Sequence, residues 1–344
     1  MKLLNALKKQ IWIIVAAIAL LTSLAAVLLS NCFKSIPLQE STRIYIPQGA
    51  TYNDVVDTLT AHNCIEDIAS FNSISNIRKY TRYVKPGSYV IKPGITQLDL
   101  VHKLRSGNQD PIRITINKHR TTEHLCQFLS GKLEIGYETL HEALTNDSIC
   151  ALYGYTPTTV IGMFPRNTYE IYWNITLEDL LKRFQKETER FWTPLRNASA
   201  KQMGLSHSEV ITLASVIDEE TNKDDEKCNI ASVYLNRLKR GMPLQADPTV
   251  KFAIGDFGIR RILNKHLAVD SPYNTYKYAG LPPGPICIPS ASSIDAVLQN
   301  PKTTYLYFCA KEDFSGYHNF ASSLREHNRN AARYHEALNR NKIR

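Results

Sequence analysis

The chain is organised around the stretch Leu213-Ala214-Ser215-Val216-Ile217-Asp218-Glu219-Glu220-Thr221, in which three consecutive carboxylates follow an apolar run. Just upstream, Ser206-His207-Ser208-Glu209 has the capping-box pattern of a helix N-terminus. Apolar residues then recur at Val210, Leu213, Ala214 and Ile217, which is the spacing of one buried helical face. The pattern predicts a helix over residues 206–221 that carries its acids at the C-terminal end.

The three carboxylates fall on different sides of this predicted helix. At about 100° per residue, Glu219 lies almost opposite the apolar stripe, whereas Asp218 and Glu220 flank it and Glu220 is slightly the closer. Apolar neighbours disfavour the charged form of a carboxyl group, so its pKa rises, as a general acid near neutral pH requires. Glu220 is therefore the candidate catalytic acid, and an ordinary solvated acidic face is the alternative.

Length and composition bound the class of protein. The 344 residues fit two globular domains plus extra segments, and 43% hydrophobic with 21% charged residues is ordinary for a packed protein. The net charge of +9 is spread along the chain, with some concentration near the C-terminus. No nucleic-acid motif accompanies it, so no nucleic-acid partner is predicted. A solvated helix face explains the basic tail, and attraction to an anionic envelope is the alternative.

A membrane anchor is predicted near the N-terminus. Residues 11–33 carry no charge and are dominated by Ile, Val, Ala and Leu, long enough for one helix to cross a bilayer. Lysines in residues 1–10 favour a cytoplasmic N-terminus, which places residues 34–344 outside the cytoplasm. A cleaved signal peptide is the competing interpretation, but the run is longer than usual and lacks a small-x-small cleavage site.

Three short units resemble one another after the anchor. Each has a β-rich run, then a Thr followed by apolar residues at +4, +5 and +8, beginning at Thr51, Thr96 and Thr121. Such units read as a strand and a Thr-capped short helix, with coincidence as the alternative. The pattern predicts small α+β modules within residues 40–145.

From about residue 150 the sequence predicts a different, mixed α/β domain with long loops. Residues 155–173 are rich in aromatics, Pro and Gly, which indicates irregular structure. Helices are predicted over 176–197, 206–221, 226–240 and 322–339, with a strand over 304–310. The fold class predicted for the whole chain is α+β.

The chemistry available to this second domain is limited by what the motifs exclude. Nucleophile-elbow, P-loop and dinucleotide patterns are absent, as are CxxC pairs and HExxH spacing, so neither a cofactor nor a metal site is predicted. The loops are dense in Tyr, Asn, Gln, Pro and Gly, which suits sugar binding. Glycoside cleavage normally uses two carboxylates, and Asp247 is the candidate second acid unless the substrate supplies its own nucleophile.

Several motifs, taken together and in order, resemble the MltG (YceG-like) family of endolytic murein transglycosylases. They span roughly residues 150–335: Ala214 to Thr221, Asn236-Arg237-Leu238, Gly241 to Thr249, Tyr273-Asn274-Thr275-Tyr276, Gly280 to Ile286, Tyr305-Leu306-Tyr307-Phe308 and Glu326-His327-Asn328. The resemblance implies a transmembrane helix, a small LysM-like α+β module over 40–145 and a catalytic domain over 150–340. It also implies a bacterial inner-membrane protein with its catalytic domain on the outer, periplasmic side.

The resemblance implies a lyase that cuts the β-1,4 bond between N-acetylmuramic acid and N-acetylglucosamine in nascent peptidoglycan, leaving 1,6-anhydro ends and terminating glycan polymerisation. The family's catalytic glutamate maps onto Glu220. Two residues upstream the family usually has Glu, whereas this chain has Asp218, which puts a supporting role for that acid in doubt. Motif position makes further residues candidates to line the glycan cleft: Gln245, Asp247, Tyr273, Asn274 and Tyr276.

Peptidoglycan strands are thus the expected partner, with the cell-wall synthesis machinery as a further one. Two other classes of function stay open at this point: a glycan-binding envelope protein with a decayed site, and a conventional hydrolase that uses Glu220 with Asp247.

Overall fold

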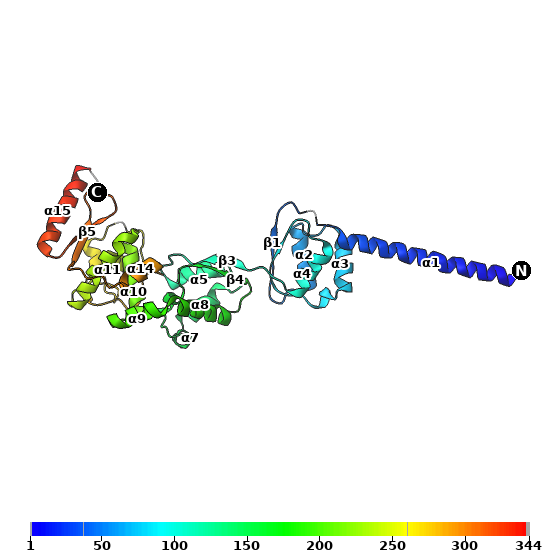
Figure 1. Ribbon diagram of the computed structural model, residues 1–344, viewed down its shortest axis with the longest axis horizontal. Helices are drawn as coiled ribbons and strands as arrows, with labels where there is room; N and C mark the ends of the chain where they lie inside the picture. Colours follow the sequence, from blue (N-terminus) through cyan, green and yellow to red (C-terminus); the bar gives the residue numbers. More distant parts are fainter. Residues whose placement is uncertain (1, 37, 260, 342–344) are drawn as a thin grey trace. The chain divides into compact units, whose positions relative to one another are not determined.

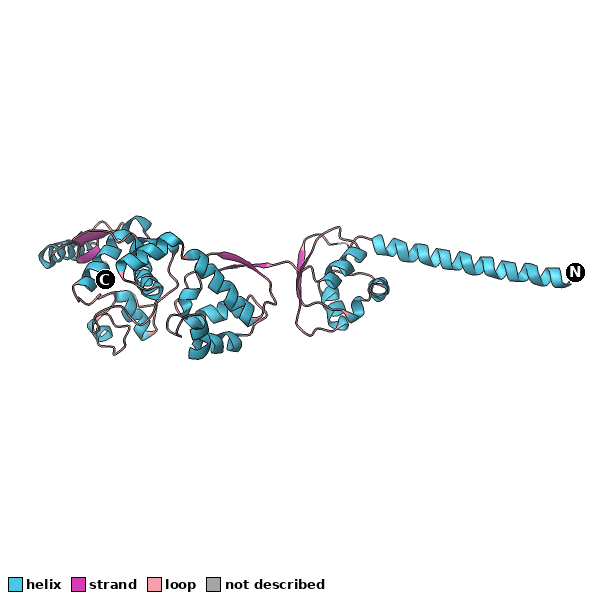
Figure 2. Ribbon diagram, turned by 60° about the horizontal axis from the view of Figure 1, so that its bottom comes forward, coloured by secondary structure: helices cyan, strands magenta, loops and turns pink. Residues whose placement is uncertain are grey.

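The computed structural model describes residues 2–36, 38–259 and 261–341; within the first helix, the side chains of residues 2–7, 24, 25, 27–29 and 31 lie outside the description. The fold is mixed α+β and mostly helical, with strands that pair two by two, which confirms the predicted α+β class (Figures 1 and 2). The chain divides into two compact units, Met1–Arg113 with Glu170–Ile175 and Ile114–Tyr169 with Thr176–Arg344. The boundary after Arg113 falls inside the range 40–145 predicted to be one LysM-like module. The LysM-like character of that range stays a prediction.

The first unit contains five α-helices or helical turns and two strands among the described residues. They are α1 (Lys2–Phe33), β1 (Thr42–Ile46), α2 (Tyr52–Ala61), α3 (Ile68–Ile77), η1 (Tyr80–Arg82), β2 (Gly87–Ile91) and α4 (Gln97–Ser106). Strands β3 (Ile112–Thr115) and β4 (Thr168–Ile171) pair with each other, and the chain passes from one unit to the other within them.

Strands β1 and β2 pair antiparallel, with Ile44 opposite Tyr89, and both side chains are buried in the core of the first unit. The repeated threonines are helix N-caps, as predicted: Thr51 begins α2, Thr96 begins α4 and Thr121 begins α5 in the second unit. Each threonine hydroxyl accepts a hydrogen bond from the backbone N–H three residues on, which satisfies one orphan donor of the helix.

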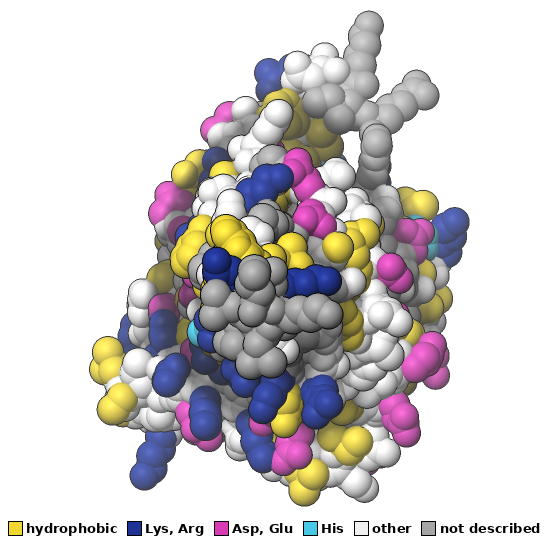
Figure 3. Space-filling view, turned by 90° about the vertical axis from the view of Figure 1, so that its right-hand side faces the viewer, with side chains coloured by type: hydrophobic (Ala, Val, Ile, Leu, Met, Phe, Trp, Pro, Cys, Tyr) yellow, Lys and Arg dark blue, Asp and Glu magenta, His cyan; other side chains and the backbone are white. Residues whose placement is uncertain are grey.

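Helix α1 exposes large apolar side chains, among them Trp12, Leu20 and Leu21. Hydrophobic and basic side chains both lie on the face of the chain drawn in Figure 3. Of the residues that can be described, none belongs to a helix with the combined length and hydropathy of a membrane span. Part of the predicted anchor, residues 24, 25, 27–29 and 31, lies outside the described side chains.

The second unit holds the remaining elements. They are α5 (Thr122–Ser130), α6 (Tyr137–Thr145), α7 (Asp147–Leu152), η2 (Val160–Met163), α8 (Leu177–Phe191), α9 (Pro194–Met203), α10 (His207–Glu220), α11 (Asp224–Lys239), α12 (Asp247–Ile254), α13 (Asn264–Leu267), α14 (Ala291–Leu298), β5 (Tyr307–Ala310), β6 (His318–Ala321) and α15 (Leu324–Arg340).

The single helix predicted over 176–197 is wrong, because it is two helices. Helix α8 ends at Phe191, and Thr193 caps a new helix whose first residue is Pro194. Proline has no N–H to donate and clashes with the preceding turn, so it is tolerated at a helix start and breaks a helix interior. The strand predicted over 304–310 is shorter, beginning at Tyr307.

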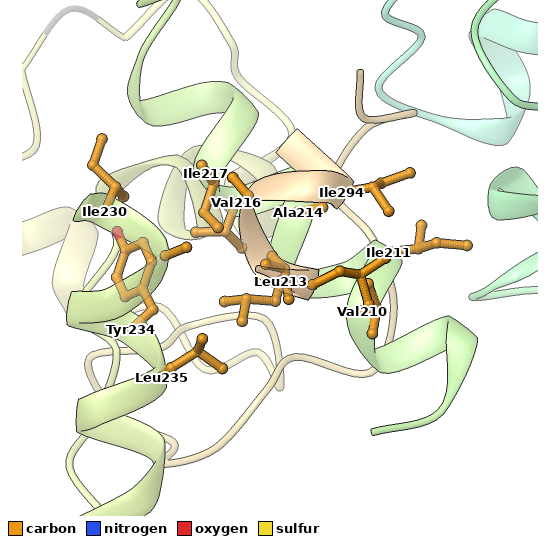
Figure 4. Close-up of a cluster of buried hydrophobic side chains, with 14 of the residues drawn as sticks. Val210, Ile211, Leu213, Ala214, Val216, Ile217, Ile230, Tyr234, Leu235 and Ile294 are labelled. Atoms are coloured by element: carbon orange, nitrogen blue, oxygen red, sulfur yellow. The ribbon is translucent and has the colours of Figure 1, made fainter. Parts of the chain in front are cut away.

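Helix α10 lies in the core of the second unit and is buried on every side from Val210 to Asp218. The predicted stripe is part of this burial, and Ser215 adds a hydroxyl that accepts from the backbone N–H of Ile286 at 2.9 Å. Figure 4 shows its apolar side chains between those of α11 and Ile294 of α14. Packing on all sides fixes the position of the last turn, where the three acids lie.

Candidate active site

Both ends of α10 are defined by local chemistry. At its start, Ser206 Oγ accepts from the backbone N–H of Glu209 at 3.2 Å, and the Glu209 carboxylate accepts from the backbone N–H of Ser206 at 2.7 Å. At its end, Thr221 turns to an extended backbone with φ −146° and ψ 144°. Residues 218–220 therefore form the last turn, and each points to a different environment.

Asp218 is a buried ion-pair centre. Its carboxylate is 4% exposed. Its two oxygens contact Ser290 Oγ (2.6 Å), Ser293 Oγ (2.6 Å), the Ser290 backbone N–H (3.2 Å), Lys118 Nζ (3.1 Å), Arg166 Nη2 (2.5 Å) and Lys227 Nζ (3.6 Å). Burial opposes ionisation, but the serine hydrogen bonds and the charges of Arg166 and Lys118 together hold the pKa of Asp218 well below its ordinary value. Asp218 is therefore a permanent carboxylate and cannot donate a proton.

Glu219 lies almost opposite the apolar stripe, yet its side chain is only 13% exposed. Arg120 grips it with two hydrogen bonds, Nε to Oε1 at 3.0 Å and Nη2 to Oε2 at 2.9 Å, and Lys118 Nζ lies 3.5 Å away. Both cations come from the segment between β3 and α5, about a hundred residues upstream, which helical periodicity cannot reveal. Bidentate pairing with arginine gives this carboxylate a fixed cationic partner.

Glu220 differs from Asp218 in that its environment raises its pKa instead of lowering it. Burial raises the pKa of Glu220 to about 7, and the negative charges of Asp247 and Glu219 add to the rise. A hydrogen bond from Tyr234 and the charge of Lys251 oppose it. Tyr234, on α11, donates its hydroxyl to Glu220 Oε1 at 2.6 Å. A carboxyl group with a pKa near 7 can both give and take a proton at neutral pH.

Glu220 opens into a pocket of about 300 Å³ in the second unit. The lining is mostly polar, with two large apolar members: Glu220, Arg237, Leu244, Gln245, Asp247, Tyr276, Phe308 and His327. Three of the five residues predicted to line a cleft are in this set, namely Gln245, Asp247 and Tyr276. Such a mixture of hydroxyl, amide and carboxylate groups around one acid fits a sugar-like, hydroxyl-rich substrate.

Asp247 is the second carboxylate of the pocket. It begins α12, where the helix dipole favours a negative charge, and it accepts from Tyr276 Oη at 2.6 Å. Burial and this hydrogen bond raise the pKa of Tyr276, which keeps the phenol protonated and donating. Two tyrosine–carboxylate pairs, Tyr234 with Glu220 and Tyr276 with Asp247, therefore belong to the same site.

Gln245 is held in an unusual backbone conformation beside these pairs. Its φ is +52°, in the left-handed region that non-glycine residues seldom adopt. Its backbone N–H donates to Thr275 O at 3.0 Å, and its side-chain oxygen accepts from Arg237 Nη1 at 3.2 Å. Arg237 also donates to the Leu306 and Leu244 carbonyls, at 2.7 and 2.9 Å. Arg237 thus connects α11 to the loop before α12, through Leu244, and to the segment before β5, through Leu306.

Two candidate cleft residues lie elsewhere. Asn274 is fully buried, and its amide donates to the Leu267 and Val269 carbonyls at 2.9 and 2.8 Å, so it shapes the loop that carries Tyr276. Tyr273 packs against the core, its ring centroid 4.6 Å from that of Phe252. Their residue types suited sugar binding, but in both cases the loop uses the polar or aromatic group for its own packing.

Comparison with known proteins places this site in a family. The YceG-like family matches residues 44–333. The endolytic murein transglycosylase of Bacillus subtilis (strain 168) is 30% identical over 315 residues, covering 87% of this chain and 86% of that protein. The chain belongs to the YceG-like family. The endolytic murein transglycosylase of Streptococcus pneumoniae serotype 2 is 27% identical over 338 residues, covering 87% of this chain and 60% of that protein.

The fold of this YceG-like chain also has a solved counterpart. The 2.6 Å crystal structure of a yceG-like protein from Listeria monocytogenes matches with a TM-score of 0.57 at 27% identity. The match covers 85% of this chain and 99% of that one. The resemblance to the family expected from the motifs is confirmed.

Several residues that line the pocket or contact Glu220 were not predicted as site residues. Arg237 and His327 lie inside motifs that marked the family, but no chemistry was assigned to them. Tyr234 lies outside those motifs, and its only signal is helical spacing: it precedes Arg237 by three residues, so both share one face of α11.

Proposed function

We propose that this chain is an endolytic murein transglycosylase that cleaves the β-1,4 bond between N-acetylmuramic acid and N-acetylglucosamine and leaves 1,6-anhydro ends. Glu220 carries the proposal: one carboxyl group with a pKa of about 7, hydrogen-bonded by Tyr234, in a polar pocket. The names of the Bacillus and Streptococcus relatives support the substrate.

The proposed reaction needs one protein carboxyl group. Protonated Glu220 donates its proton to the glycosidic oxygen, and the bond from that oxygen to the muramic C1 breaks. The 6-hydroxyl of the same muramic residue then attacks C1, and its proton passes to the Glu220 carboxylate. A 1,6-anhydro ring forms and Glu220 ends protonated, so no water is consumed. General acid–base catalysis of this kind contributes about 10²–10⁴-fold to rate.

The two acids that precede Glu220 on α10 support this assignment, because both form ion pairs with basic side chains. Asp218 is paired with Lys118 and Arg166, and Glu219 is paired with Arg120, so both carboxylates already have cationic partners. Asp247 is free of a cation among the described residues, and its charge raises the pKa of Glu220. In the reaction proposed here it stabilises positive charge that develops on the sugar ring.

Glu220→Gln tests the role of the acid. The full chain, in mild detergent, is incubated with uncrosslinked glycan strands and the products are analysed by mass spectrometry. Wild type should yield products one water lighter than hydrolysis products, and Glu220→Gln should lose at least about 100-fold in rate while staying folded. Glu178→Gln is the matched control, since Glu178 is 70% exposed and pairs with the solvent-facing Lys182. Turnover retained in Glu220→Gln would refute the assignment of Glu220 as the catalytic acid.

A two-carboxylate hydrolase is the second candidate, favoured by the position of Asp247 in the same pocket. Hydrolysis would leave hydrated reducing ends, and Asp247→Asn would then remove activity as completely as Glu220→Gln. Anhydro ends exclude this candidate. A wild-type chain that is inactive but still captures glycan strands would instead indicate a decayed, binding-only site.

We also propose that residues 11–33 anchor the chain in the bacterial inner membrane, with residues 34–344 on the outer side. Support comes from the uncharged run and from the apolar side chains that α1 exposes. The same arrangement would bring the site to nascent strands, where cleavage terminates polymerisation and where contact with the cell-wall synthesis machinery is expected. The full chain should stay in the membrane fraction during carbonate extraction, and removal of residues 1–33 should release it. A truncated chain that stays in the membrane fraction would contradict the anchor.

A further inference from the structure

The hydrogen bond between Tyr234 and Glu220 has a fixed direction. The Tyr234 side chain is buried, with only 1% exposed, and its ring meets Phe308 edge-on at 5.9 Å. Burial and the adjacent carboxylate raise the pKa of Tyr234 well above its ordinary value. The phenol therefore stays protonated at every working pH, and Tyr234 is always the donor and Glu220 always the acceptor.

This fixed direction makes the two oxygens of Glu220 unequal. Oε1 accepts from Tyr234 at 2.6 Å. No described residue donates a hydrogen bond to Oε2, and the Glu220 side chain lines the pocket. An oxygen that already accepts a short hydrogen bond is the poorer place for a proton, so protonated Glu220 carries its hydrogen on Oε2.

We propose that Tyr234 is a positioning residue that makes Oε2 of Glu220 the single site of both proton delivery and proton return. This inference rests on the function proposed above. Tyr234 holds the carboxyl plane, so the oxygen that protonates the glycosidic bond is the one that later accepts the proton of the 6-hydroxyl. Its hydrogen bond also stabilises the carboxylate that exists between the two transfers.

The other groups around Glu220 act on it through charge and leave its orientation to Tyr234. Asp247 and Lys251 face it from α12, Glu219 from α10, and Arg237 and His327 line the same pocket from α11 and α15. Burial and the charge of Arg237 lower the pKa of His327, so it is neutral near pH 7 and contributes no competing charge. Tyr276, the remaining phenol, donates to Asp247.

Tyr234→Phe is the decisive variant, because it keeps the ring and removes only the donor. Loss of a hydrogen bond to a charged group should raise the pKa of Glu220 by about one unit. Since Glu220 must be protonated to begin the reaction, the alkaline limb of the kcat profile should move up by about one unit. With the carboxyl group free to turn, kcat at its plateau should fall about tenfold with KM little changed.

Tyr169→Phe is the matched control, because Tyr169 is also buried and its hydroxyl also makes one hydrogen bond, to Pro165 O at 2.7 Å, but the residue is not in the pocket. It should leave the pH profile unchanged. An unshifted alkaline limb in Tyr234→Phe, or equal effects of the two variants, would overturn the proposal and leave Tyr234 a packing residue.

Two further measurements keep the test decisive if Tyr234→Phe folds poorly or the enzyme is inactive. Site-specific replacement of Tyr234 by 3-fluorotyrosine makes a stronger donor and should move the alkaline limb down; no movement refutes the proposal. Titration of ¹³C-labelled glutamate carboxyl groups, with the Glu220 signal assigned by its loss in Glu220→Gln, reads the pKa without turnover. Wild-type inactivity would refute the proposed function, whereas an unshifted Glu220 titration in Tyr234→Phe would refute this inference alone.

Discussion

Replacing Asp218 by Asn should destabilise the second unit more than any other change of a single carboxylate in the last turn of α10. Oδ1 of Asp218 accepts from both Ser290 and Ser293, whereas Oδ2 contacts Lys118 and Arg166. Asparagine can keep its oxygen on the serine side. Its NH₂ group then faces two cationic donors, and a buried donor meets donors with no acceptor between them.

The magnitude follows from what remains after the change. Removing one partner of a buried ion pair typically costs about 3–5 kcal/mol. Lys118 still donates to the backbone carbonyl of residue 218 at 2.7 Å, and Arg166 still donates to the Ile288 carbonyl at 2.7 Å. Each cation therefore retains one hydrogen-bond acceptor in the variant. The free energy of unfolding should therefore fall by about 3 kcal/mol, the lower end of that range.

The same reasoning fixes the pH dependence. The pKa of Asp218 is lower in the folded than in the unfolded chain, so its stabilisation is present above the unfolded value and is lost as pH falls through the folded one. The stability difference between wild type and Asp218→Asn should be constant from pH 7 down to about pH 4 and should narrow below that.

The assay is urea denaturation followed by fluorescence of Trp192, which is 5% exposed in the core of the second unit. Replacing Trp12 and Trp173 by Phe leaves Trp192 as the single tryptophan of the chain. Asp295→Asn is the control, since that carboxylate pairs with Arg196 but is 41% exposed, and it should cost no more than about 1 kcal/mol. A cost for Asp218→Asn no larger than the control, or one that does not change with pH, would refute the argument.

Three other predictions follow from single contacts. Wild-type kcat should fall as pH rises past about 7, because Glu220, whose pKa is about 7, must be protonated to donate; activity that keeps rising to pH 9 would contradict this. Gly284→Ala should cost several kcal/mol, because its Cβ would lie 2.1 Å from the Thr158 carbonyl oxygen, and thermal unfolding measures the loss. Ser206→Ala removes the N-cap of α10 and should lower stability by about 1 kcal/mol with kcat unchanged, measured in the same two assays.

Much of the fold could be predicted because its signals are local. Ser206, Thr51, Thr96 and Thr121 each begin a helix where a short-range capping pattern indicated one. The error at α8 and α9 was also local: Pro194 marked a helix start, and its periodic surroundings concealed it. By contrast, the burial of α10 on every side depends on α11, α12 and α14 arriving from later in the chain.

The site was predictable only in part for the same reason. Glu220 was found because its flank position is a property of its own helix. The pairing of Gln245, Asp247 and Tyr276 into one pocket follows motif order, but the diversion of Asn274 into its own loop does not. Residue type says that an amide can bind a sugar hydroxyl; only the fold says whether a backbone carbonyl has already taken it.

The three adjacent acids show most clearly how distant partners decide chemistry. Asp218, Glu219 and Glu220 are nearly alike as isolated side chains, with ordinary pKa values within about half a unit of one another. Cations from residues 118–166 pair with the first two, whereas Glu220 is buried and has a phenol and like charges as neighbours. The cations paired with Asp218 and Glu219 also offset the charge of these two carboxylates, which limits how far they raise the pKa of Glu220. Neutralising Arg120 should therefore raise the pKa of Glu220 further, which links the segment before α5 to catalysis without any contact with substrate.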